Sequence, residues 1–184
     1  MAEEVSLERV EGRRVVEELV DQVVEVWAAA HGLSSASATR REFGTTRIPR
    51  HARHAGFRFV GAFAPGGRLV GFVYGYTGAS GQWWHDKVAA ALDSETRAAW
   101  LEPPHFELTE IAVDPPYQGH GVGSRLHDAI LEGLPGDRAL LSALADNAPV
   151  LRFYARRGWR VLLDELRFEP GRPVFSILGK ELRQ

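Results

Sequence analysis

The most informative stretch of the chain is Val113-Asp114-Pro115-Pro116-Tyr117-Gln118-Gly119-His120-Gly121-Val122-Gly123-Ser124. An apolar run ends at Val113, two prolines turn the chain, and a glycine-rich loop leads into a predicted helix. Glycine has no Cβ, so backbone N–H groups in such a loop can approach a ligand closely. The start of a helix adds unpaired N–H donors and the positive end of its dipole. The stretch therefore predicts an anion site suited to a phosphate or pyrophosphate.

Two common phosphate-binding motifs fit this loop poorly. A nucleotide P-loop needs a lysine after its last glycine, and no lysine lies here. The dinucleotide fingerprint needs glycine or alanine where Ser124 stands, and it usually opens its domain, whereas most of this chain precedes the loop. A glycine loop that only turns a corner remains the structural alternative.

The rest of the chain alternates between strand and helix patterns. Strands are expected over 5–10, 57–64, 69–77, 105–113, 138–144, 159–168 and 174–182, and helices over 11–31, 82–102, 122–133 and 149–157. Residues 34–56 read as an irregular, basic segment with a short helix. The order predicts a mixed α/β fold in a single domain, 1–184, with antiparallel strands first and a β-α-β unit later. Residues 78–104 are expected to be a helical insertion.

Composition excludes several classes of protein. The 184 residues carry a net charge of −2, which argues against a general nucleic-acid binder. The absence of cysteine excludes disulfides, Cys-ligated zinc and an acyl-cysteine intermediate. No apolar run reaches the roughly 18 residues of a membrane span, and the acidic start is not a secretory signal, so a cytoplasmic location is expected. Arginine far outnumbers lysine, since Lys87 and Lys180 are the only lysines, which favours a GC-rich bacterial source.

Two motifs give the chain its resemblance to the GCN5-related N-acetyltransferases, the GNAT family. The family's acetyl-CoA loop, Q/R-x-x-G-x-G/A, matches Gln118-x-x-Gly121-x-Gly123. A second signature, an Asn followed by a Tyr and a Gly-aromatic pair, matches Asn147, Tyr154 and Gly158-Trp159. The motifs stand in the family's order, and Trp159 replaces the usual Phe. The resemblance implies a mostly antiparallel, twisted sheet of about six to seven strands, flanked by helices, whose fourth and fifth strands splay apart.

The resemblance also implies where acetyl-CoA would bind. Backbone groups of Ile111, Ala112 and Val113 would pair with the pantetheine arm and polarise the thioester carbonyl. Asn147, with Arg152 or Arg156, could reach the far part of CoA. The pyrophosphate would lie on the N–H groups of the loop, which comprises Gln118, Gly119, His120, Gly121, Val122, Gly123 and Ser124. No metal is expected.

Acyl transfer to an amine requires a base and an acid. Tyr154 is the candidate acid, because a phenol can protonate the departing thiolate; its alternative role is that of a core aromatic. Glu107 and Glu110 compete as the base. Family members with a base on this strand place it four or six residues before the equivalent of Val113, and Glu107 lies at six, on the face of Thr109, Ile111 and Val113. A bulge would favour Glu110, and a water relay is a further alternative.

The sequence leaves the acceptor open between a small amine, an amino acid, and an amine of a peptide or protein. Adjacent Trp83 and Trp84 cannot both face one core, so one is expected near solvent or a pocket, where with His85 it could recognise the acceptor. Residues 78–104 would then shape the acceptor site. A non-catalytic CoA-binding sensor or scaffold is the alternative function. Exposed strand edges near the C-terminus would allow a homodimer.

Overall fold

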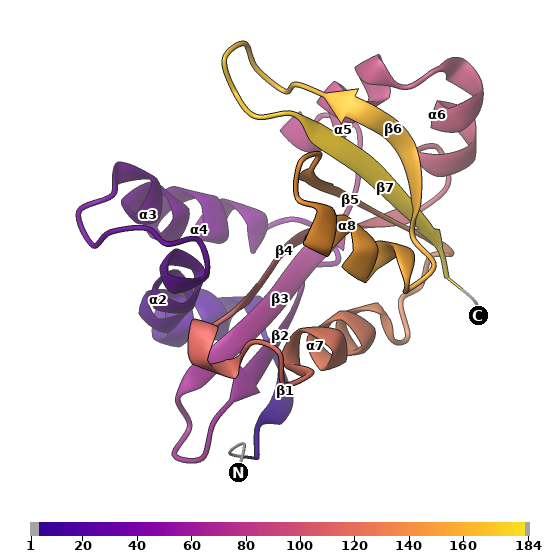
Figure 1. The fold of residues 1–184 in the computed structure, drawn as a ribbon. Helices are drawn as coiled ribbons and strands as arrows, with labels where there is room; N and C mark the ends of the chain where they lie inside the picture. Colours follow the sequence, from indigo (N-terminus) through magenta and orange to yellow (C-terminus); the bar gives the residue numbers. More distant parts are fainter. Residues whose placement is uncertain (1–3, 183–184) are drawn as a thin grey trace. The chain divides into compact units, whose positions relative to one another are not determined.

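The computed structural model describes residues 4–182 and contains a mixed seven-stranded sheet with helices (Figure 1). The strand order is β1-β2-β3-β4-β5-β7-β6. Strands β4 and β5 pair in parallel. The pairs β1–β2, β2–β3, β5–β7 and β6–β7 are antiparallel. The strands are β1 (Ser6–Val10), β2 (Arg58–Phe63), β3 (Leu69–Thr77), β4 (His105–Val113), β5 (Arg138–Leu144), β6 (Arg160–Leu166) and β7 (Phe175–Glu181).

The contacts of the chain divide it into two compact units. The first runs up to Tyr76 and includes Thr109–Glu132, and the second comprises Thr77–Leu108 and the chain from Gly133 onward. Strand β4 contributes its first four residues to the second unit and its last five to the first. That the chain forms one domain, with 78–104 as an insertion, stays a prediction.

The first unit packs an amphipathic helix onto strands β2 and β3. The helix runs through α1 (Gly12–Arg14), η1 (Val15–Leu19) and α2 (Val20–Ala30), and Val15, Leu19, Val23 and Trp27 recur every four residues on its buried side. These side chains join Phe59, Phe72 and Tyr74 of the strands in one apolar cluster. The helix ends at Ala30, and Gly32 follows with a φ of 63° in the left-handed region, where glycine is favoured.

The sequence predicts an irregular segment with a short helix over 34–56, and the structure makes a longer stretch helical, residues 38–51. These form α3 (Ala38–Glu42), η2 (Phe43–Arg47) and α4 (Ile48–His51). The segment lacks a long apolar stripe, but Phe43 and Ile48 are both buried in the apolar cluster of the first unit. Burial of these two side chains therefore stabilises a helical segment that is longer than the local sequence pattern indicates.

The second unit has its own core, which α5 (Trp83–Ala91) and α6 (Ser94–Trp100) form with β5 and β7. Val88, Leu92 and Trp100 pack there with Leu140 and Ile177. Helix α6 starts after Asp93, whose carboxylate caps it by accepting a hydrogen bond from the Thr96 N–H at 2.8 Å. Among residues 4–182, no helix combines the length and apolar character needed to cross a bilayer.

The buried His51–Tyr74 contact of the first unit should make stability depend on pH. His51 Nδ1 lies 3.0 Å from the Tyr74 hydroxyl. Burial, then the charges of Arg50, His54 and Arg47, lower the pKa of His51 from 6.5 to about 3. Between these values the unfolded chain binds a proton that the folded chain does not. The free energy of unfolding should therefore fall as the pH is lowered, by about 1.4 kcal/mol per pH unit from this group.

Urea unfolding of wild type and His51→Asn between pH 7 and 4.5 isolates this contribution. Asparagine keeps a hydrogen-bonding group for Tyr74 but does not titrate. The wild type should lose more stability than the variant over this range, and parallel curves would show that His51 is not held neutral.

Candidate functional site

The glycine-rich loop leads into the N-terminus of α7 (Val122–Leu131) in the first unit. It follows a short turn, η3 (Pro115–Tyr117), and residues 118–121 are exposed. Gly119 and Gly121 have φ values of 76° and 80°, a conformation that side chains disfavour. A Cβ at either position would meet nothing within 4 Å. These glycines are therefore required by backbone conformation, and the space over the loop is open.

Side-chain hydrogen bonds fix the shape of the loop and of the turn that precedes it. Gln118 Nε2 donates a hydrogen bond back to the Val113 carbonyl at 2.8 Å, and His120 Nδ1 lies 2.8 Å from the Gln118 carbonyl. Arg68 bonds the Asp114 carboxylate and the Tyr117 hydroxyl, each at 3.1 Å. Gln118 of the motif thus orders the turn, and the loop presents backbone groups and the helix N-terminus to the space above it.

The first turn of α7 is anchored by its apolar face. Val122, Leu126 and Ile130 are buried, and α7 lies beside β2 (Figure 1). Gly123 and Ser124 are half-buried. A Cβ at Gly123 would contact Val113 Cγ2 at 3.8 Å, an ordinary van der Waals distance, so a side chain fits at this position.

Glu110 lies on β4 in the first unit, beside helix α2. Its side chain is 20% exposed, and Oε1 lies 3.9 Å from His31 Nε2. Burial raises the pKa of Glu110, while His31, the Trp27 indole and Arg47 act in the opposite direction. The same strand segment exposes Ile111 and Val113 in part and buries Ala112. Glu110 is a carboxylate with a partly compensated charge.

Glu107 lies in the second unit and is more deeply buried. Its side chain is 4% exposed, and Oε1 lies 3.6 Å from Nε2 of His105, which is 1% exposed. His105 is not among the residues that the sequence motifs mark. Its position two residues before Glu107 on a strand places both side chains on one face, which is the signal that could have found it.

Helix α8 (Ala148–Ala155) carries the second motif. Asn147 caps it, since its Oδ1 accepts a hydrogen bond from the Val150 N–H at 3.3 Å. Tyr154 is 5% exposed, and its ring packs edge-on against Phe153 and Trp159, with centroids 5.2 and 5.5 Å away. The aromatic after Gly158 therefore packs against the candidate acid, and Arg152 and Arg156 are exposed on the same helix.

The adjacent tryptophans on α5 point to different surroundings, as expected. Trp83 is 53% exposed, whereas the half-buried Trp84 donates its indole N–H to Ser142 Oγ at 3.2 Å. His85 is buried and stacks on His105, with ring centroids 5.4 Å apart. An acceptor role for these residues stays a prediction.

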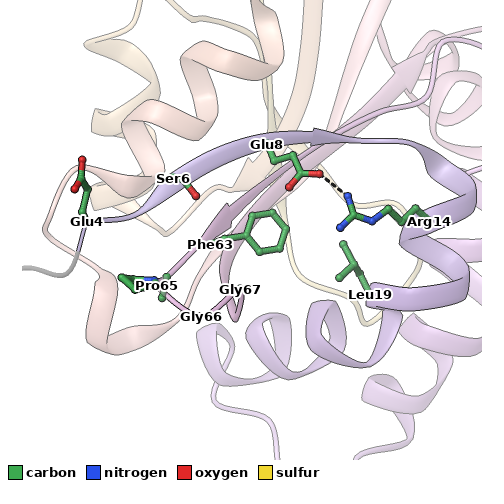
Figure 2. Close-up of a pocket in the computed structure, with 10 residues that line it drawn as sticks. Glu4, Ser6, Glu8, Arg14, Leu19, Phe63, Pro65, Gly66 and Gly67 are labelled. Carbon is green, nitrogen blue, oxygen red and sulfur yellow. Dashed lines mark hydrogen bonds and ion pairs between the residues drawn. The ribbon is translucent and has the colours of Figure 1, made fainter.

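A groove at the β2–β3 turn involves none of the sequence-predicted site residues (Figure 2). Its polar side chains include Glu8 and Arg14, which pair with each other. Among the described residues, no three His, Cys, Asp or Glu side chains gather as a metal site. His51 and His54 lie near each other, with ring centroids 6.0 Å apart, but no third such side chain of the described residues joins them.

Comparison with known proteins agrees with these motifs. Residues 21–159 match the model of the Acetyltransferase (GNAT) family. The chain is 32% identical over 164 residues to the GCN5-like protein acetyltransferase Rv2170 of Mycobacterium tuberculosis, covering 85% of this chain and 75% of that protein.

Solved structures share the fold at low identity. PH1933 from Pyrococcus horikoshii matches with a TM-score of 0.68 and 17% identity, over 98% of this chain and all of that one. The PaiA N-acetyltransferase of Thermoplasma acidophilum, solved in complex with coenzyme A, matches with a TM-score of 0.56 and 18% identity, over 97% and 99% of the two chains. By its family match and its relative, the chain belongs to the GNAT family of acetyltransferases.

Proposed function

We propose that this chain is an acetyl-CoA-dependent N-acetyltransferase that moves the acetyl group directly to a primary amine. The observation that carries the proposal is the loop at the start of α7, where two glycines with positive φ leave open space in front of a helix N-terminus. Such a site favours a phosphate or pyrophosphate. Membership of an acetyltransferase family and the coenzyme A bound to the Thermoplasma relative favour CoA as the source of that pyrophosphate.

The proposed roles follow the chemistry of the side chains. Acetyl-CoA supplies the activated acetyl group. Residues Gln118–Ser124 would hold its pyrophosphate, backbone groups of Ile111–Val113 its pantetheine arm, and Asn147 the more distant part. Glu107 would accept a proton from the acceptor ammonium, and Tyr154 would donate one to the departing thiolate. Direct transfer is favoured because the chain has no cysteine to carry the acetyl group.

A protein amine is the first acceptor to test, because the 32%-identical relative is named a protein acetyltransferase. The exposed Trp83 on α5 would suit recognition of a cationic acceptor. Thiol release from acetyl-CoA, measured with a panel of peptides, amino acids and small amines, tests the function. Turnover with any of them excludes the sensor alternative, and a lack of acetyl-CoA binding at millimolar concentration would refute the proposal.

Gly123→Asp should abolish CoA binding in a folded protein. The carboxylate would add negative charge in the first turn of α7, where the pyrophosphate is proposed to lie. Gly123 is a sharper test than Gly121, because Gly121 has a φ of 80° and any side chain there is strained. Calorimetric titration with CoA measures the effect. Gly123→Ala is the matched control, since its Cβ makes only the 3.8 Å contact with Val113, and it should still bind. Equal CoA affinity in the Asp and Ala variants would remove the pyrophosphate assignment.

Tyr154→Phe should lower kcat by about 10²- to 10⁴-fold, the usual contribution of a general acid. The ring and its packing against Trp159 are retained, so thermal stability and the Kd for acetyl-CoA should change little. Steady-state kinetics together with a melting curve separate these effects. An unaltered kcat would leave Tyr154 as a packing residue.

Glu107→Gln should flatten the acid limb of the pH profile of kcat, whereas Glu110→Gln should not. Glutamine keeps the shape of the side chain but cannot accept the ammonium proton. The two variants are matched, since both carboxylates lie on β4 and each faces a histidine ring nitrogen. The reverse pattern, with Glu110→Gln inactive, would move the base to Glu110, and two active variants would favour a water relay.

A further inference from the structure

His105 and Glu107 are partners in the interior of the second unit. They stand two residues apart on β4, so their side chains leave the same face of the strand. The side chains are 1% and 4% exposed, and Nε2 of His105 lies 3.6 Å from Oε1 of Glu107. A carboxylate this far from water needs a compensating group.

The other nitrogen of His105 defines its tautomer. Nδ1 lies 3.0 Å from the Pro103 carbonyl oxygen, which can only accept, so Nδ1 carries the hydrogen. Nε2 of the neutral ring is then a lone pair, and no hydrogen bond reaches it from the described residues. A charged carboxylate also only accepts. With a neutral His105 and a charged Glu107, two acceptors face each other, and a proton bound by either one converts the contact into a hydrogen bond.

Neighbouring elements hold this pair in place. The Gly78 N–H donates to the His105 carbonyl at 3.0 Å. A Cβ on Gly78 would collide with His105 Nε2 and would lie 2.5 Å from Glu107 Oε1, so only glycine fits over the pair. On α5 the His85 ring stacks on His105 at 5.4 Å between centroids.

The charged groups of these elements are paired elsewhere. His85 Nδ1 lies 3.4 Å from Asp86 on α5. Arg138, opposite His105 in the β4–β5 register, lies 3.2 Å from Asp137 and over the Trp100 ring. Nε2 of His105 thus faces the Glu107 carboxylate. The neighbouring His85 and Arg138 lie beside their own carboxylates, Asp86 and Asp137.

We propose that His105 is a positioning residue that acts with Glu107 as one proton-accepting pair. This role rests on the proposed acetyl transfer. Glu107 takes the proton from the acceptor ammonium, leaving the amine lone pair free to attack, and the new O–H donates to His105 Nε2 or transfers its proton there. Taking up the proton replaces two opposed lone pairs with one hydrogen bond between Glu107 and His105.

The tautomer can be measured without any substrate. Long-range ¹H–¹⁵N spectra of histidine-labelled free protein, with the His105 signals assigned through His105→Asn, should show hydrogen on Nδ1 and not on Nε2. A neutral ring with hydrogen on Nε2 would overturn the proposal. This measurement stands even if no amine is acetylated, an outcome that would refute the proposed function separately.

His105→Asn tests the effect on the reaction. Asparagine can keep a donor toward Pro103 but has no atom at the Nε2 position. The acid limb of kcat should move to lower pH and kcat should fall about tenfold or more, short of the roughly 10²- to 10⁴-fold loss of a general base, with an unchanged Kd for acetyl-CoA. If this variant does not fold, His105→Gln provides the second test, because its amide N–H would donate permanently to Glu107 and also move the limb to lower pH.

His31→Asn is the matched comparison. His31 Nδ1 also lies against a backbone carbonyl, that of Trp27 at 2.8 Å, and its Nε2 faces Glu110 at 3.9 Å, but its side chain is 44% exposed. A larger shift of the acid limb in His105→Asn than in His31→Asn supports the proposal. An unmoved limb in the folded His105 variants, or a larger shift in His31→Asn, overturns it.

Discussion

Strand β4 pairs in parallel with β5 from His105 to Glu107, and the candidate chemistry depends on this pairing. The register runs from His105↔Arg138 to Glu107↔Leu140. Gly136 allows the pairing to start, because a Cβ there would lie 2.7 Å from the Pro104 carbonyl oxygen. The segment Ile111–Val113, proposed to hold the pantetheine arm, lies farther along the same strand.

Two glutamates on the same strand meet the cost of burial in different ways. Glu110 remains partly exposed and lies near an exposed histidine, an indole and an arginine, so its charge is supported from several sides. Glu107 is almost fully buried and faces a buried histidine whose tautomer is fixed by a carbonyl. An isolated buried charge is unfavourable, so Glu107 depends on the groups packed around it.

Family membership and the residue-level proposals rest on different observations. The family follows from a match over residues 21–159 and from a 32%-identical relative. Structural neighbours at 17–18% identity extend only the fold. The proposal of a protein amine as acceptor therefore rests on the exposed Trp83 and on the name of one relative. The helices over 38–51 show that the local sequence pattern describes part of the chain poorly. Their stability depends on burying Phe43 and Ile48 against residues that are distant in the sequence.

The sequence by itself determined the elements whose signals are local. Apolar periodicity predicted the long first helix, and the strands expected over 57–64 and 69–77 lie within one residue of β2 and β3. The side chains of Asp93 and Asn147 cap helices through backbone groups three residues away, so these helix starts depend on local sequence. The loop at Gly119 and Gly121 was readable because positive φ selects glycine. Tertiary structure alone decided which partner each glutamate has. Glu107 and His105 share a strand, but the Gly78 backbone that covers them comes from another part of the sequence, as does the His31 ring near Glu110. Contacts between distant segments depend on which elements pack together, and the local pattern of an element does not specify its partner.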